Sequence, residues 1–147
     1  MIRPMMESDK EEVLQMMRRF YDSPAVAHTA SDAVLARDVA ACLTEGSCLD
    51  GFVLEQEGQI AGYAMTAKSY TTEYGGTCIW LEDLYLKPEY RHLGLAGAFF
   101  RYMEAYYPEA VRFQLEVEPE NVFAVQCYQK YGYQISPYWK MTKEIEA

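Results

Sequence analysis

The stretch that decides the fold runs from residue 81 to residue 97 and reads LEDLYLKPEYRHLGLAG. Its first six residues are mostly apolar and typical of a strand, Lys87-Pro88 ends that strand, and a basic loop leads into a helical pattern. The first turn of a helix offers unpaired N–H groups, and small residues at Gly94, Ala96 and Gly97 let a ligand approach the backbone closely. The stretch therefore predicts an anion site suited to a pyrophosphate, although a turn that only packs helix on sheet would look similar.

Upstream of this stretch the chain alternates between extended and helical patterns. A strand is predicted over residues 77–86, preceded by a β-hairpin whose strands, 52–55 and 59–66, flank a Glu57-Gly58 turn. A short extended start at 2–4 comes before two helices. The first is predicted from the capping box Ser8 to Glu11, and the second from the N-cap Ser31.

Downstream, a helix is predicted over 94–107, a strand over 111–117, a helix that Asn121 caps and Gly132 ends, and a final strand around 138–141. This order of elements favours an α/β sandwich with a mixed sheet. A dinucleotide-binding Rossmann fold is disfavoured, because its Gly-rich turn would follow the first strand and not the fourth. The length of 147 residues indicates one domain, 1–147.

The overall charge limits the choice of partners. A formal net charge of -9 argues against nucleic acid or an anionic membrane surface as the main partner, and suits a small cationic molecule or a basic protein tail. An acidic balance is also ordinary solubility chemistry. The four cysteines and two histidines show no metal-ligand spacing, so no metal is expected. Reduced thiols, no signal region and no membrane span are expected, which points to the cytoplasm.

The Arg91-x-x-Gly94-x-Ala96 pattern resembles the coenzyme A pyrophosphate loop of the GNAT superfamily of N-acetyltransferases. A second motif, 115–117 with the residues after it, resembles that family's fifth strand and following helix. Two motifs in the expected order make coincidence improbable. The resemblance implies a GNAT-like α+β sandwich, with a mostly antiparallel mixed sheet of six to seven strands flanked by about four helices, and a homodimer.

The resemblance also implies acetyl-CoA as the acyl donor, without a metal. His92 departs from the family, which often has Gly at this position. The residues implied to bind the donor are Leu84, Tyr85, Leu86, Arg91, His92, Leu93, Gly94, Leu95, Ala96, Gly97, Asn121, Ala124, Tyr128 and Lys130.

Direct transfer is the reaction that the resemblance implies: an amine attacks the thioester carbonyl and coenzyme A leaves as a thiol. A primary amine is mostly protonated near neutral pH, so a base must accept a proton, and Glu82 is the leading candidate. Tyr128 occupies the family's position for the acid that protonates the thiolate. The oxyanion is expected to meet backbone N–H groups of the strand that carries Leu84 and Leu86.

Residues 80–86 are similar to the corresponding strand of diamine (spermidine/spermine) acetyltransferases, which places Asp83 near the acceptor. Adjacent strand residues point to opposite faces, so Glu82 and Asp83 should not converge unless a β-bulge intervenes. Tyr21, Asp22 and Trp80 are further candidates for holding a cation through carboxylates and ring faces. These residues equally suit a loop that covers the core or a dimer contact.

The sequence thus predicts transfer of an acetyl group from acetyl-CoA to a primary amine, with a small cationic amine or polyamine as the favoured acceptor. Two alternatives stay open. One is a protein or peptide N-acetyltransferase, and the other is a sensor that binds acyl-CoA without turnover.

Overall fold

The computed structural model describes residues 1–145, which contain four α-helices and five β-strands. The helices are α1 (Lys10–Tyr21), α2 (Asp32–Cys42), α3 (Leu95–Tyr106) and α4 (Val122–Lys130). The strands are β1 (Ile2–Pro4), β2 (Leu49–Gln56), β3 (Gln59–Thr71), β4 (Gly76–Leu86) and β5 (Ala110–Leu115), with single 3₁₀ turns at Glu7–Asp9 and Pro88–Tyr90. None of the helices in this range combines the length and the apolar character that crossing a bilayer requires.

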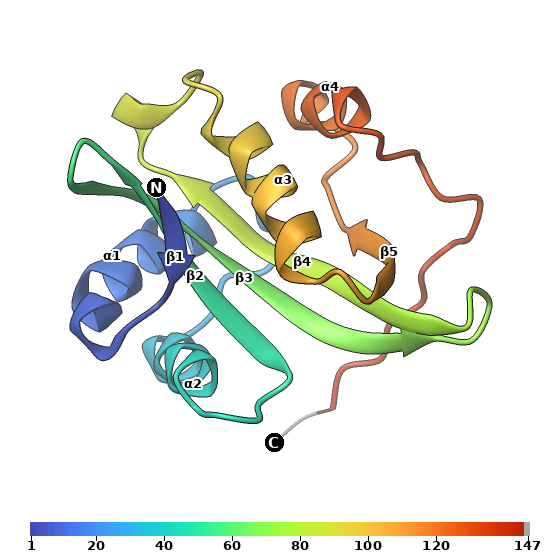
Figure 1. The fold of residues 1–147 in the computed structure, drawn as a ribbon, viewed down its shortest axis with the longest axis horizontal. Helices are drawn as coiled ribbons and strands as arrows, with labels where there is room; N and C mark the ends of the chain where they lie inside the picture. Colours follow the sequence, from blue (N-terminus) through green and yellow to red (C-terminus); the bar gives the residue numbers. More distant parts are fainter. Residues whose placement is uncertain (146–147) are drawn as a thin grey trace.

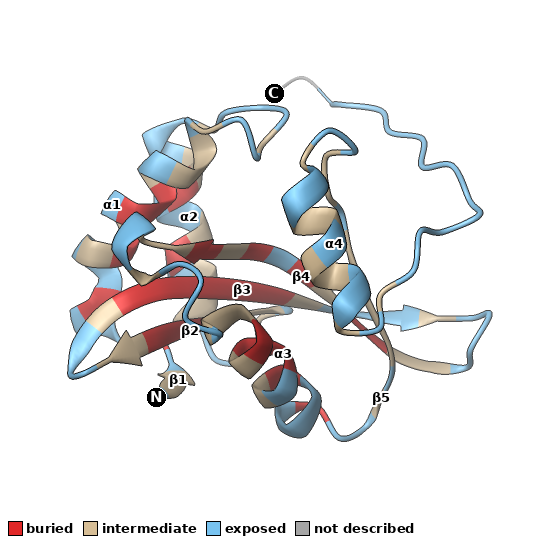
Figure 2. Ribbon diagram, turned by 90° about the horizontal axis from the view of Figure 1, so that it is seen from above, coloured by how far each residue is buried: buried red, intermediate tan, exposed pale blue. Residues whose placement is uncertain are grey.

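The sheet has the strand order β1-β2-β3-β4-β5, antiparallel except for the parallel pair β4 and β5. Helices α1 and α2 cover one face and α3 covers the other, with α4 beyond β4 at the β5 end (Figures 1 and 2). The mixed, mostly antiparallel sheet and the four helices are confirmed. The predicted number of strands was wrong, because the described residues form five and not six to seven.

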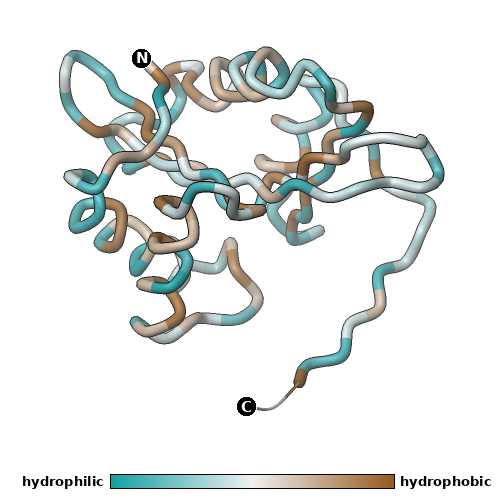
Figure 3. The backbone as a smooth tube through the Cα atoms, turned by 60° about the horizontal axis from the view of Figure 1, so that its bottom comes forward, coloured by the Kyte–Doolittle hydropathy of each residue, from teal (hydrophilic) through white to brown (hydrophobic). Residues whose placement is uncertain are grey.

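The prediction that failed is the final strand around residues 138–141. Residues 131–145 contain no helix or strand, and Figure 3 shows the last part of this segment running away from the body of the molecule. Pro137 lacks the N–H that a sheet ladder needs. At the predicted strand itself, the Tyr138 hydroxyl donates to Glu73 at 2.5 Å and Lys140 forms an ion pair with Glu116. Trp139 is therefore left 96% exposed.

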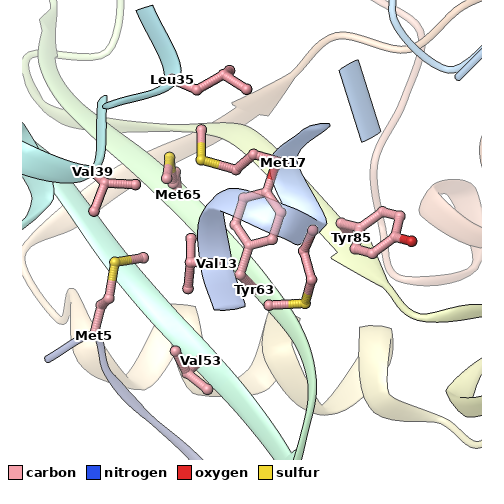
Figure 4. Close-up of a cluster of buried hydrophobic side chains, with 10 residues drawn as sticks. Met5, Val13, Met17, Leu35, Val39, Val53, Tyr63, Met65 and Tyr85 are labelled. Atoms are coloured by element: carbon pink, nitrogen blue, oxygen red, sulfur yellow. The ribbon is translucent and has the colours of Figure 1, made fainter. Parts of the chain in front are cut away.

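Two hydrophobic cores lie on the two faces of the sheet. The first packs α1 and α2 on β2, β3 and β4, and Figure 4 shows Tyr63 and Tyr85 among its Met and Val side chains. The second packs α3 and aromatic residues from α4 onward against the opposite face. Because β4 contributes to both cores, its position between them is closely fixed.

The starts of the first two helices illustrate one wrong and one correct prediction. Helix α1 does not use the Ser8–Glu11 capping box. Its approach is set by Asp9, which accepts a hydrogen bond from the Met6 N–H at 2.8 Å and pairs with both terminal nitrogens of Arg3. Helix α2 is capped as predicted, with the Ser31 hydroxyl accepting from the Val34 N–H at 3.3 Å.

Candidate active site

A cleft opens where β4 and β5 diverge. The two strands pair from Thr77 opposite Ala110 as far as Leu81 opposite Leu115. β5 ends there, whereas β4 continues to Leu86. The result is a cleft of about 730 Å³, walled by β4, the start of α3, the segment after β5, α4 and the end of α1. One edge of β4 is thereby exposed to a ligand-sized space.

The exposed edge of β4 presents the backbone of Leu84 and Leu86. The Lys87 N–H donates to the Ala61 carbonyl of β3 at 2.8 Å. Because backbone direction alternates along a strand, Tyr85 also turns its amide towards β3, and Leu84 and Leu86 turn theirs towards the cleft. The Leu86 carbonyl accordingly accepts a hydrogen bond at 2.9 Å from the Arg91 side chain, which lies on that side.

The loop between β4 and α3 has two residues in left-handed conformation, His92 at φ 64° and Gly94 at φ 80°. His92, which departs from the family pattern, therefore has a backbone conformation that glycine would adopt with less strain. The N–H of Ala98 bonds to the carbonyl of Gly94 at 3.1 Å. The N–H groups of the preceding turn have no helical acceptor, so they and the helix dipole are available to an anion, and the anion site stays a prediction.

Only some residues of this predicted donor loop reach the cleft wall. Arg91 and Ala96 line it, whereas His92, Leu93, Gly94, Leu95 and Gly97 do not. The reason for the small residues also differs between positions. A Cβ on Gly94 would meet no atom within 4 Å, but a Cβ on Gly97 would lie 2.0 Å from the Tyr131 hydroxyl. The absence of a side chain at Gly97 therefore makes room for Tyr131, and contact between the Gly97 backbone and the donor stays a prediction.

Glu82 occupies a β-bulge. Met65 of β3 lies opposite Asp83 and Thr66 lies opposite Leu81, so Glu82 has no partner on β3. The bulge interrupts the alternation of side chains, because Leu81 and Leu84 both pack in the core beneath α3. The two acidic residues between them stay outside that core. The sequence predicts that Glu82 and Asp83 point to opposite faces unless a β-bulge intervenes. Such a bulge is present at Glu82.

The two carboxylates differ in surroundings. Glu82 lines the cleft and is exposed, but the cleft walls partly desolvate its carboxyl, and this desolvation together with Glu116 raises its pKa. Asp83 is 4% exposed and accepts hydrogen bonds from the hydroxyls of Tyr21 at 2.9 Å and Tyr63 at 2.8 Å. Burial raises the pKa of Asp83 to about 6, and the two phenols oppose that rise.

On the opposite wall, α4 brings Tyr128 to the cleft. The Asn121 side chain caps α4 by accepting from the Ala124 N–H at 3.2 Å, and all three residues line the cleft. The Tyr128 ring packs on Phe100, with ring centroids 5.7 Å apart, and burial raises the pKa of its hydroxyl. Within residues 1–145 no hydrogen-bond partner is found for that hydroxyl, so its proton is available to a ligand. Lys130 does not line the cleft.

The remaining predicted acceptor residues are not all brought together. Tyr21 reaches Asp83, but Asp22 forms an exposed ion pair with Arg18 at 2.8 Å, and Trp80 does not line the cleft. Residues that sequence reasoning missed include Phe20, Ser23, Pro24, Ala25, Glu116, Glu118, Glu120, Phe123 and Cys127, all of which line the cleft. The only signal for the three glutamates was their alternation across the end of the predicted strand 111–117. No cluster of metal ligands is found among residues 1–145.

Comparison with known proteins explains this arrangement. Residues 11–133 match the model of the acetyltransferase (GNAT) family. The chain belongs to that family. The resemblance noted from the sequence is thus confirmed, and with it acetyl-CoA as the family's acyl donor. The cleft fits such a donor, because it joins free β4 amides to the N-terminus of α3 and to Arg91.

Individual relatives support the same fold. Bovine thialysine N-epsilon-acetyltransferase is 30% identical over 108 residues, which are 69% of this chain and 63% of the bovine enzyme. A possible acetyltransferase from Clostridium difficile 630 superposes with a TM-score of 0.86 at 19% identity, over 100% of this chain and 98% of that one. An aminoglycoside N-acetyltransferase solved in complex with CoA gives a TM-score of 0.81 at 16% identity, over 98% and 93% of the two chains.

Proposed function

We propose that this protein transfers an acetyl group from acetyl-CoA to the primary amine of a small cationic acceptor. The observation that carries the proposal is that Glu82 lines one wall of the cleft and Tyr128 the other, with no hydrogen-bond partner for the Tyr128 hydroxyl within residues 1–145. A carboxylate with a raised pKa and a free phenol are the base and the acid that aminolysis of a thioester requires.

The donor side uses groups that the strand and helix leave free. Arg91 and the first turn of α3 supply positive charge and N–H donors for the pyrophosphate. The N–H groups of Leu84 and Leu86 supply donors along β4, where the thioester carbonyl needs them as charge develops on its oxygen. These roles need only the backbone at Leu84 and Leu86, because their side chains pack in the core beneath α3.

The proton transfers follow from the two walls. Glu82, directly or through one water, accepts a proton from the ammonium, and the free amine then forms the new N–C bond. As the C–S bond breaks, Tyr128 donates its proton to the departing sulfur. The acetylated nitrogen loses its second proton as the amide forms, and this proton restores the Tyr128 hydroxyl, directly or through water. A pKa raised by desolvation makes Glu82 a stronger base than an ordinary carboxylate, which favours proton removal near neutral pH.

The preference for a cation rests on the charge of the cleft. Glu82, Glu116, Glu118 and Glu120 line it, and Arg91 is the one basic residue among its lining residues. Because Arg91 lies at the donor end, the rest of the wall is acidic. The name of the bovine relative indicates a side-chain amine as its acceptor. Both observations support a polyamine or a related diamine as acceptor.

A thiol-release assay with acetyl-CoA tests the proposal. The acceptor panel contains polyamines, thialysine, aminoglycosides, neutral amino acids and short basic peptides. We expect the highest kcat/KM with a di- or polyamine. Turnover of peptides alone would replace this proposal with a protein N-acetyltransferase, and CoA binding without turnover of any amine would indicate a sensor.

The cellular location and the assembly belong to the same proposal. We expect a cytoplasmic homodimer, and the free state of Cys42, Cys48, Cys78 and Cys127 is compatible with a reducing compartment. Light scattering at several protein concentrations tests the dimer, and a constant monomer mass would reject it. Fractionation of the source cells tests the location.

A further inference from the structure

Asp83 is adjacent to the proposed base but is enclosed by two elements. Tyr21, at the end of α1, donates to one carboxylate oxygen at 2.9 Å, and Tyr63, on β3, donates to the other at 2.8 Å. The side chain is 4% exposed. Asp83 does not line the cleft, so its carboxylate is separated from an acceptor bound there.

A negative charge on Asp83 lowers the stability of the folded protein. The groups that face it besides the two phenols are Asp38 and the Cys42 thiol from α2 and its neighbour Glu82. No basic group within residues 1–145 bonds to it. An uncompensated buried carboxylate costs stability, whereas a neutral amide would fit the same space. Such a cost is typical of a residue kept for function.

The β-bulge shows what Asp83 can do. The bulge leaves one residue of β4 without a partner on β3. This residue is Glu82 only as long as Asp83 stays opposite Met65. The two phenols hold Asp83 in that register from two sides. We infer that Asp83 is a positioning residue, which, clamped by Tyr21 and Tyr63, fixes the bulge that presents Glu82 to the cleft. The role of Glu82 as a base rests on the proposed function. The positioning of the bulge by Asp83 does not.

The first test needs no activity. The Glu82 carboxyl is followed by carbon-13 NMR during a pH titration of wild type, Tyr21→Phe and Tyr63→Phe. Both variants keep the Asp83 charge and remove one phenol. We expect the raised pKa of Glu82 to fall towards its ordinary value, because a released bulge returns the carboxyl to water. The other charges near Glu82, from Glu116, Lys140 and Asp38, are unchanged. An unmoved Glu82 titration in both variants would overturn the inference.

The second test is a double-mutant cycle of Asp83→Asn and Glu82→Gln, measured by thiol release. A residue that acts through Glu82 should lower kcat by roughly 10- to 100-fold alone and add nothing when Glu82 is already changed. Effects that multiply, or a rise in the acceptor KM alone, would mean that Asp83 contacts the acceptor and would reject the inference.

Asp9→Asn is the matched control for both tests. Asp9 is also 4% exposed and its oxygens are also engaged, by Arg3 and the Met6 N–H, but at the distant start of α1. We expect lower stability for this variant with unchanged kcat and an unchanged Glu82 titration. The wild-type protein in the same assays tests the proposed function separately, since the NMR result stands whether or not an acceptor is found.

Discussion

Asp9 and Asp83 are equally buried, yet their surroundings move their pKa values in opposite directions. Hydrogen bonds from Arg3 lower the pKa of Asp9, whereas burial raises that of Asp83 to about 6. The first carboxylate is stabilised as an anion by a cation, and the second by phenols only. A single residue type thus serves as a structural anchor at one site and as a strained group at the other.

These directions predict how stability depends on pH. Between the ordinary pKa near 3.8 and about 6, folded Asp83 holds a proton that the unfolded chain has lost, so its contribution makes the protein more stable as the pH falls from 7 to 5. Asp9 contributes stability that is lost only at lower pH, as its depressed pKa is approached. We expect urea unfolding of wild type to show a gain of about 2 kcal/mol at most at pH 5 over pH 7.5.

Asp83→Asn identifies the residue responsible. The amide cannot ionise, so the variant should match or exceed wild type in stability at pH 7.5 and lose most of the gain at pH 5. A gain of the same size in the variant would assign the pH dependence to another group, for which Glu82, whose pKa is also raised, is the first candidate.

Tyr128 carries the second residue-scale prediction. Tyr128→Phe keeps the ring that packs on Phe100 and removes only the hydroxyl. We expect kcat to fall by roughly 100-fold or more, with little change in acetyl-CoA affinity measured by calorimetry. Tyr133→Phe is the control, because Tyr133 packs on the same Phe100 but does not line the cleft. Equal kcat in the two variants would remove Tyr128 from the acid role.

At the scale of elements, the loop before α3 depends on backbone conformation more than on side-chain contacts. Gly94 has φ 80° and open space around it, so an added methyl group meets strain and no clash. Gly94→Ala should lower acetyl-CoA affinity by roughly tenfold, because relief of a strain of about 1 to 2 kcal/mol disturbs the N–H groups of the site.

Gly58→Ala provides the matched control for Gly94→Ala. Gly58 lies in the β2–β3 turn with φ 78° and equally open space, so it should lose similar stability and no affinity. Calorimetric titration with acetyl-CoA and thermal unfolding measure the two effects separately. A Gly94→Ala protein with wild-type affinity would show that the loop does not bind the donor.

Local sequence patterns predicted most helices and strands. They missed the features that depend on residues distant in sequence. The Glu57-Gly58 turn and the Ser31 cap are decided by adjacent residues, and both predictions are confirmed. The bulge at Glu82 depends on the register of β4 against β3, which no local pattern contains. The start of α1 depends on Arg3 pairing with Asp9, and this contact overrides the Ser8 signal.

The candidate site shows the same division. The loop from Arg91 was recognisable because its spacing is local, but the acidic wall after β5 was not, since only the divergence of β4 and β5 brings it opposite Glu82. The packing of Tyr131 against Gly97 was not foreseen for the same reason, because Tyr131 is distant in sequence. A short motif is enough to predict a donor site, whereas the walls of the cleft depend on tertiary packing.

For the whole molecule, the net charge of -9 and the acidic cleft act together on a cationic acceptor. If the acceptor is the proposed polyamine, the general field attracts it to the protein, and the glutamates after β5 concentrate that attraction at the cleft. Salt screens both effects, because the Debye length shortens from about 20 Å or more at low ionic strength to about 8 Å at 0.15 M. The acceptor's kcat/KM should therefore fall steeply with added salt.

The salt dependence can separate the cleft from the overall charge. In wild type we expect kcat/KM for a diamine or polyamine to fall by roughly tenfold between low salt and 0.3 M NaCl. Changing Glu116, Glu118 and Glu120 to Gln should flatten that dependence. Changing Glu11, Glu45 and Glu57 to Gln removes the same charge from exposed positions outside the cleft and should largely preserve it. Equal slopes for the two triple variants would mean that the cleft does not select the acceptor by charge, and a neutral acceptor would then become the better choice for this site.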